Sequence, residues 1–159
     1  MYGLLADLRS HRVWAGERQK AKTRLVSIEA PEGLAEVGTE FRTVGADPMG
    51  RFEDRSVVTE AIPSRVFEFV TEAHLETRRG RGVDWTVVHR YELSPAEGRC
   101  RIAYTIRIVR LSELAGALAM FKIPGLRSVA LKASAGVAKR GVVNLARLAE
   151  ERTSSRSLG

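Results

Sequence analysis

Polar side chains that could do chemistry recur at alternate positions in two segments that are otherwise rich in apolar residues. His89 and Tyr91 share one side of segment 83–94, and Cys100 and Tyr104 share one side of segment 99–110. A histidine on an apolar face could act as a general base with a pKa lowered by burial, or it could belong to the core, bonded to a tyrosine hydroxyl. The tyrosines could donate to a ligand carbonyl or to a protein partner, and Cys100 is expected to act as a small apolar residue. His89 is therefore the candidate catalytic residue.

Other constellations of catalytic or metal-binding residues are missing from the sequence. It contains no glycine-rich phosphate loop, no HExxH pair and no second cysteine. The three histidines lie on separate expected elements, so they do not indicate a shared metal site. Glu53 and Asp54 are consecutive in an alternating segment and point to opposite faces, which excludes a carboxylate pair by that spacing. We expect neither a metal nor a cofactor.

The elements that must position these residues are six short strands between two helical regions. Tyr2, Leu4, Leu5, Leu8 and Trp14 fall on one side of a short N-terminal helix. Turns rich in proline and glycine separate the alternating segments, and they are too short to hold a crossover helix. The sequence therefore predicts an antiparallel meander, with strands at 22–30, 37–47, 51–62, 65–75, 83–94 and 99–110.

A long helix from Pro124 to about Arg152 is the only element that could cover the apolar face of this sheet. Its inward positions become small in the middle, at Ala133, Val137 and Gly141, and Gly136 is a second glycine inside the helix. This composition has two explanations: the helix approaches the sheet closely, or the small side chains leave space that bounds a cavity. We expect one domain over 1–152 and a flexible tail over 153–159.

Length, composition and charge limit the class of protein. With 159 residues, 44% of them hydrophobic and 28% charged, the chain is expected to be a single soluble domain. The lone cysteine, the lack of a recognisable signal peptide and the shortness of the apolar run 114–121 favour the cytoplasm. Most of the net charge of +7 lies after residue 110. A basic amphipathic helix suits a phosphate backbone, an anionic lipid surface or simply a solvated face.

The order of these elements is that of the helix-grip fold, an α+β fold in which a curved antiparallel meander packs on a long C-terminal helix. The chain resembles the SRPBCC or START-like superfamily, particularly its polyketide cyclase/dehydrase and lipid-transport branch. The matching pieces are 5–8 leading to Trp14, 37–42, 57–69, and 85–95 with Gly98 following. Members usually begin with a strand that pairs beside the last strand. Here residues 1–5 are already helical in pattern, so we expect that first strand to be missing, with the native start upstream or the edge unpaired.

The resemblance implies that a small hydrophobic ligand (a lipid, a quinone or a polyketide-like molecule) binds in a cavity between the sheet and the long helix. The chain would then be a carrier or sensor. One alternative is a polyketide cyclase or dehydratase that uses His89 as acid and base. Another is binding of nucleic acid or a partner by the basic helix. An anionic membrane surface and a second copy of the chain are further candidate partners, and nucleic acid ranks behind them. The lining that the resemblance implies is Trp14, Phe41, Phe67, Phe69, Trp85, His89, Tyr91, Tyr104, Leu118, Phe121, Ala133 and Val137, with Leu118 and Phe121 in a segment that is either a lid or packed on the core.

Overall fold

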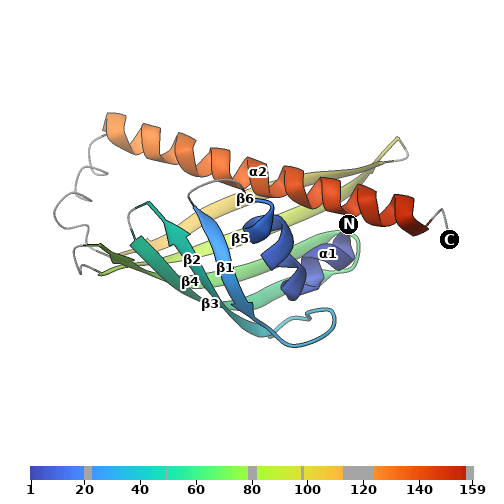
Figure 1. Cartoon of the computed structure of the whole chain (residues 1–159), viewed down its shortest axis with the longest axis horizontal. Coiled ribbons are helices and arrows are strands. Elements are labelled where there is room, and N and C mark those ends of the chain that lie inside the picture. The colour runs from blue at the N-terminus through green and yellow to red at the C-terminus, as the bar shows by residue number, and fades with distance from the viewer. Residues whose placement is uncertain (20–22, 49, 79–81, 98, 113–123, 157–159) are drawn as a thin grey trace.

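The chain folds into a six-stranded antiparallel sheet with helices on one of its faces (Figure 1). The computed structural model describes residues 1–19, 23–48, 50–78, 82–97, 99–112 and 124–156, and for 47, 124–134 and 156 it describes the backbone only. The elements are α1 (Tyr2–Ala6), η1 (Leu8–Ser10), η2 (Arg12–Glu17), β1 (Arg24–Glu29), β2 (Glu40–Asp47), β3 (Gly50–Ile62), β4 (Val66–Thr77), β5 (Gly82–Ala96), β6 (Arg99–Leu111) and α2 (Pro124–Arg156).

The predicted meander is confirmed. The strands follow one another across the sheet in chain order, and each pairs antiparallel with the next. Every predicted strand is present within a few residues, because alternating side chains and turn residues mark both its faces and its ends. At two of the turns Ser64 and Glu97 have φ values of 61° and 40°, in the left-handed region that tight turns use.

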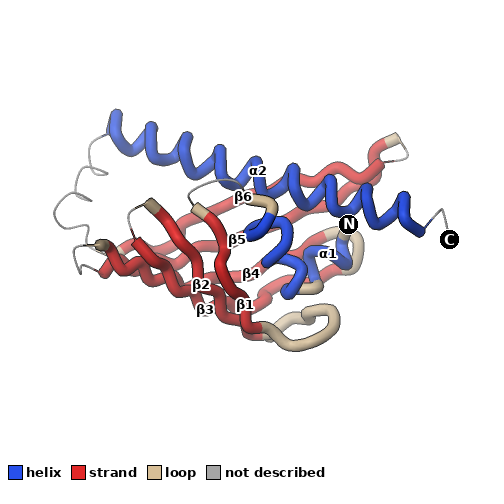
Figure 2. Tube along the Cα trace, viewed as in Figure 1, coloured by secondary structure: helices blue, strands red, loops and turns tan. Residues whose placement is uncertain are grey.

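The N-terminal region differs from the single helix predicted for it. It forms three short pieces, an α-helical turn, a 3-10 turn and a π-helical turn, which Figure 2 shows packed against one end of the sheet. Asp7 leaves helical geometry with ψ at 89°. Side chains then bind the carbonyl groups of α1: the Ser10 hydroxyl donates to the Leu4 oxygen at 2.5 Å, and His11 Nε2 lies 2.8 Å from the Leu5 oxygen. These bonds replace the backbone ladder of a continuous helix.

Helix α2 is 33 residues long, about 50 Å, and runs across the inner face of the sheet beside β6 (Figure 1). It continues four residues past the predicted end at Arg152. Hydroxyl groups of Thr153, Ser154 and Ser155 bind carbonyl oxygens four residues earlier, at 2.9 to 3.1 Å. Residues 153–156, which the sequence analysis assigned to a flexible tail, are thus helical, and residues 157–159 lie outside the described part.

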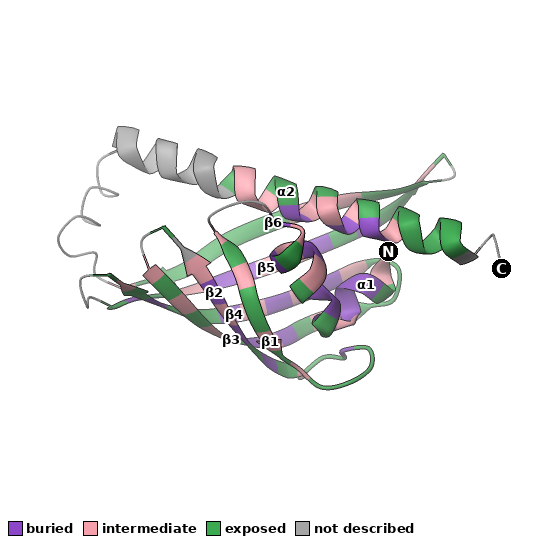
Figure 3. Ribbon diagram, in the orientation of Figure 1, coloured by how far each residue is buried: buried purple, intermediate pink, exposed green. Residues whose placement is uncertain are grey.

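The main core lies at one end of the inner face. There α1, η1, η2 and the C-terminal half of α2 meet the sheet, and Figure 3 shows the buried residues concentrated at this end. Phe67, Leu5 and Leu145 are fully buried. A Cβ added at Gly141 would lie 3.7 Å from the ring of Trp14, so this glycine faces a closely packed indole. We call this region the packed end.

The predicted apolar face of β6 is only partly covered, which corrects the expectation that its whole inner side is buried. Ile102 and Tyr104 are half-buried, but Cys100 is exposed, and Ile106, Ile108 and Leu111 are 43%, 54% and 47% exposed. Alternation shows which side of a strand is apolar, but it does not show whether another element reaches that side. Among the described residues β6 pairs only with β5, so it forms an edge of the sheet.

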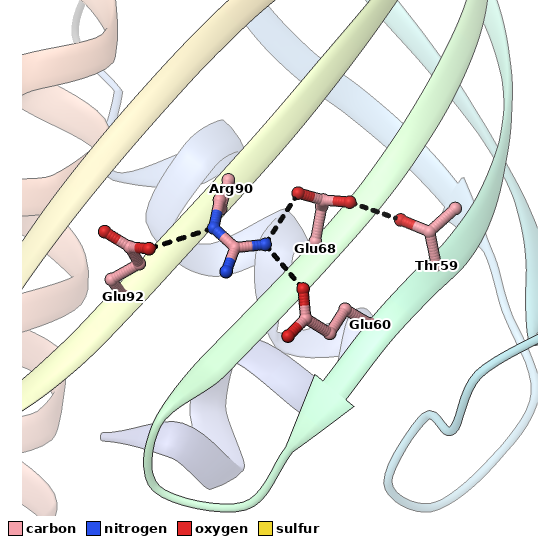
Figure 4. A network of polar contacts seen from close by, with 5 residues as sticks. All are labelled: Thr59, Glu60, Glu68, Arg90 and Glu92. Atoms are coloured by element: carbon pink, nitrogen blue, oxygen red, sulfur yellow. Dashed lines mark hydrogen bonds and ion pairs between the residues drawn. The ribbon is translucent and has the colours of Figure 1, made fainter.

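The outer face of the sheet carries a network of charges (Figure 4). The guanidinium of Arg90 binds Glu60, Glu68 and Glu92 at 2.5, 2.9 and 3.0 Å. Burial raises the pKa of Glu68, but bonds from Arg90 and Thr59 outweigh it and leave that pKa below its usual range. A β-bulge between Val58 and Glu60 turns both Thr59 and Glu60 outward, which brings them into the network.

Candidate functional site

The candidate site is the inner face of the sheet, where the strand register sets side chains in rows. Tyr91 of β5 lies between Phe67 of β4 and Tyr104 of β6. The next row along the strands joins Phe69, His89 and Ile106. Both rows begin in the packed end and run outward to the edge strand. The fold therefore brings the predicted aromatic residues together around His89.

The rings around His89 form stacked pairs. The centroid of His89 is 4.7 Å from that of Phe69, with the planes 20° apart, and Tyr91 and Tyr104 stack at 4.3 Å and 13°. His89 Nδ1 lies 2.6 Å from the Tyr104 hydroxyl, which also bonds the hydroxyl of Tyr91. In the tautomer protonated at Nε2, Nδ1 accepts the Tyr104 proton. His89 thus has the hydroxyl partner expected of a core histidine, and no bond from its Nε2 is present among the described residues.

Burial sets the protonation states of this cluster. It lowers the pKa of His89 to about 4, and the charge of His11 acts in the same direction. Burial likewise raises the pKa values of Tyr91 and Tyr104. At neutral pH the imidazole is therefore uncharged and both phenols keep their protons. The group offers hydrogen bonds to a neutral guest but no fixed charge.

The predicted lining residues divide into buried and half-buried groups. Trp14, Phe41, Phe67, Phe69 and Tyr91 are all less than a tenth exposed and pack into the main core. Trp85, His89 and Tyr104 are half-buried. Because the first group is enclosed by the fold itself, only the second group and the open side of β6 offer surface to a guest.

Four of the predicted lining residues lie on α2 or in the segment before it, and the structure describes the side chain of only one of them, Val137. Val137 is half-buried, and its carbonyl oxygen accepts from Gln19 Nε2 at 3.2 Å. A Cβ added at Gly136 would meet no described atom within 4 Å, in contrast to Gly141. Close approach of helix and sheet thus applies at Gly141, whereas Gly136, five residues earlier, lies about 140° around the helix from that packed side. Leu118, Phe121 and the side chain of Ala133 lie outside the described residues.

Asp54 is a polar residue of the inner face that the sequence analysis did not select. Its Oδ2 accepts from the Thr43 hydroxyl at 3.2 Å, whereas the buried Oδ1 has no partner among the described residues. Burial raises the pKa of this carboxyl to about 7, although the bond from Thr43 lowers it. The signal was present in the sequence, because Asp54 shares its alternation phase with Phe52 and Val58.

Hydroxyl groups and aromatic rings surround Asp54. Along β3 its inward neighbours are Phe52 and Ser56, and the Ser56 hydroxyl bonds that of Thr71 at 2.8 Å. Across the sheet the register places Ala73 beside Asp54, and Trp85 beyond Ala73. Phe52 and Trp85 both pack against the small apolar cluster of Leu75 and Val83. We call this part of the inner face, from Asp54 to Trp85 and the exposed residues of β6, the open end.

A separate pocket lies outside the inner face. It has a volume of about 170 Å³ and is formed by Leu8 and the loop 31–39 (tan in Figure 2). None of the predicted site residues lines it. Its lining includes the carboxylates of Glu32 and Glu36, and Glu32 already binds Arg9 at 2.9 Å.

The part of the chain that the structure describes meets the requirements neither of a metal site nor of a membrane-spanning helix. No cluster of three or more His, Cys, Asp or Glu side chains could hold a metal ion. None of the described helices combines the length and apolarity needed to cross a membrane. On α2 the basic residues Lys139, Arg140, Arg147 and Arg152 are exposed. Binding of nucleic acid, an anionic lipid surface or a second copy stays a prediction.

Comparison of the chain with protein-family models, with curated proteins and with solved structures finds no match.

Proposed function

We propose that the chain has a helix-grip fold of the SRPBCC type and binds a small hydrophobic ligand between the inner face of the sheet and α2, as a carrier or sensor. The order of short helices, antiparallel meander and long C-terminal helix supports this fold. The ligand class is a lipid, a quinone or a polyketide-like molecule.

The observation that carries the proposal is the uncovered apolar side of β6. Ile106, Ile108 and Leu111 face inward by register, opposite His89, Val87 and Trp85, yet each is more than two fifths exposed. Fully covering such a side chain is worth about 1.5 to 3 kcal/mol. A guest seated against these residues would remove them from water and would contact the half-buried rings of Trp85 and Tyr104.

A matched pair of variants tests this proposal. Ile108 and Val109 are almost equally exposed, at 54% and 57%, but Val109 follows the inward-facing Ile108 in the strand and therefore lies on the outer face. Binding of decylubiquinone, palmitate and an anthraquinone to the wild type would be measured by native mass spectrometry. The affinity of each variant would then be measured with decylubiquinone, which is uncharged. Ile108→Asp should weaken decylubiquinone binding at least tenfold, because the carboxylate would face the apolar guest, and aspartate is too short to extend into water.

The matched control, Val109→Asp, should leave that affinity unchanged. The proposal fails if no probe binds the purified chain, or if the two variants behave alike. Thermal unfolding of both variants checks that each is folded.

The Nε2 atom of His89, which has no bond among the described residues, supports a second candidate function, cyclisation or dehydration of a polyketide-like substrate. In the alternative tautomer, protonated at Nδ1, the imidazole would donate to the Tyr104 oxygen. Its Nε2 could then accept a proton from the substrate while the phenol donates to a substrate carbonyl. Replacing His89 by Gln and by Phe would then reduce turnover of a polyketide-like substrate by about a hundredfold or more. Unchanged turnover in either variant would remove His89 from the chemistry.

A further inference from the structure

Asp54 is an acidic side chain without a cationic partner on the described part of the inner face. The strand side chains that face inward, among those described, include one carboxylate and no lysine or arginine. Register places Thr43 and Ala73 beside it, so neither adjacent strand supplies a cation. Its Oδ2 has the Thr43 hydroxyl, but its buried Oδ1 has no donor among the described residues. A buried carboxylate oxygen without a donor is costly, and proteins rarely retain one without a reason.

The surroundings of Asp54 fit a positively charged group. Phe52 precedes it on the same face of β3, and its ring lies over Gly45, where an added Cβ would clash with it. Trp85 lies in the same row, separated from Asp54 by the small side chain of Ala73. Aromatic faces attract cations, and the hydroxyls of Ser56 and Thr71 add acceptor oxygens nearby.

The carboxyl group can be reached from the open end. Asp54 as a residue is half-buried even though Oδ1 is enclosed. The χ2 torsion of an aspartate has a broad energy profile. The carboxylate can therefore rotate so that Oδ1 faces the open end. A cationic guest would then replace the missing donor.

We propose that Asp54 binds the protonated nitrogen of an amphipathic amine, whose apolar part extends over Trp85 and the exposed residues of β6. This inference rests on the proposed function, since it names the polar end of the same guest. The charged nitrogen bonds Oδ1 and lies near Phe52, while the hydrocarbon covers Ile108 and Leu111.

The test compares decylamine with decanol, two probes that share one hydrocarbon chain. Affinities would be measured by calorimetry on the full chain, with the variant Asp54→Asn and the matched control Glu53→Gln. Glu53 is the exposed neighbour on the opposite face of β3. The wild type should bind decylamine about ten- to a hundredfold more tightly than decanol, as expected for a bond to a charged partner. Asp54→Asn should abolish that preference, and Glu53→Gln should keep it.

The possible failures are distinguishable. Equal affinity for both probes in the wild type, or an amine preference that persists in Asp54→Asn, overturns the amine assignment and leaves the proposed function standing. A preference for decanol that Asp54→Asn abolishes would assign a neutral guest instead. Binding of neither probe, together with failure of the quinone and lipid probes, removes the proposed function as well. If the variant does not fold, the carboxyl ¹³C resonance of Asp54 in the wild type decides, because it should shift with decylamine and not with decanol.

Discussion

The two ends of the inner face are built from similar residue types but differ in what covers them. In the packed end Phe67, Trp14 and Leu145 are enclosed by α1, η2 and the C-terminal half of α2. In the open end Trp85 is half-buried, and the isoleucines of β6 are exposed. Gly141 meets an indole ring, whereas Gly136 meets no described atom. The difference shows that apolar character alone does not assign a residue to the core, because another element must also reach it.

Truncating an aromatic ring at each end should give the largest contrast. Phe67→Ala should destabilise the fold by about 3 to 5 kcal/mol, because it empties a fully enclosed site. Trp85→Ala should cost clearly less, since part of that ring is already in contact with water. Urea unfolding followed by circular dichroism measures both. Equal losses would mean that Trp85 is as well packed as Phe67 and would end the distinction between the two ends.

Acidification should act first on the packed end. Burial lowers the pKa of His11 to about 4, below its ordinary 6.5, although the bond to the Leu5 oxygen and the charge of Asp7 oppose the shift. Between pH 6.5 and 4 the unfolded chain therefore binds more protons at this site than the folded chain. The contribution of neutral His11 is complete above pH 6.5 and falls by up to about 3 kcal/mol as the pH drops toward 4.

Unfolding free energies measured across this pH range provide the check, with His11→Gln compared to the wild type. The variant should lose less stability on acidification. His74→Gln, which removes an exposed histidine bound to Asp84 at 2.7 Å on the outer face, is the comparison variant for a histidine outside the core. A wild-type slope that His11→Gln does not reduce would contradict the assignment.

The open end should respond to pH in the opposite direction. The folded-state pKa of Asp54 is raised to about 7 from 3.8. Its contribution to stability is complete below pH 3.8 and is lost as the pH rises through about 7. Asp54→Asn should therefore stabilise the unliganded protein at pH 8 by roughly 1 to 3 kcal/mol. Melting temperatures at pH 8 and pH 4 should show the gain at the higher pH only, and a loss at pH 8 would mean that the carboxylate has a partner.

The two glycines of α2 give the finest comparison, and Gly136 gives its smallest expected effect. Gly136→Leu should gain up to about 1 kcal/mol from helix propensity, because the added side chain meets open space. Gly141→Leu should lose about 1 to 3 kcal/mol, since its outer carbons must displace the ring of Trp14. Urea unfolding measures both variants, and equal changes in stability would contradict this comparison.

The strands were predictable because each is short, alternating and bounded by turn residues. Val83 to Leu93 shows its two faces without interruption, so both its position and its orientation followed from the sequence. The segment 51–62 was harder, because the β-bulge between Val58 and Glu60 shifts the alternation by one residue. Alternation places Asp54 on the same face as Phe52. An aspartate in a strand is ordinarily assigned to the solvent-exposed face, however, so the sequence analysis did not select it.

The covering of each face was less predictable than the faces themselves. The half-buried state of His89 depends on Phe69 and Tyr104, which are twenty and fifteen residues away in the chain. Nothing local in the sequence distinguishes Ile102, which is half-buried, from Ile108, which is exposed. Ile102 packs against the main core, which does not extend to Ile108, and how far the core extends along a strand is a tertiary property.

The edge formed by β6 has a consequence for solution behaviour. Arg99, Arg101, Arg107 and Arg110 lie along this strand, which contains no acidic residue. Two molecules that approached strand to strand would bring these guanidinium groups together, and an edge carrying one sign of charge resists such pairing. The repulsion weakens as salt screens it over about 8 to 10 Å. Self-association through this edge is therefore expected to be weakest in buffer of low ionic strength and to increase as salt is added.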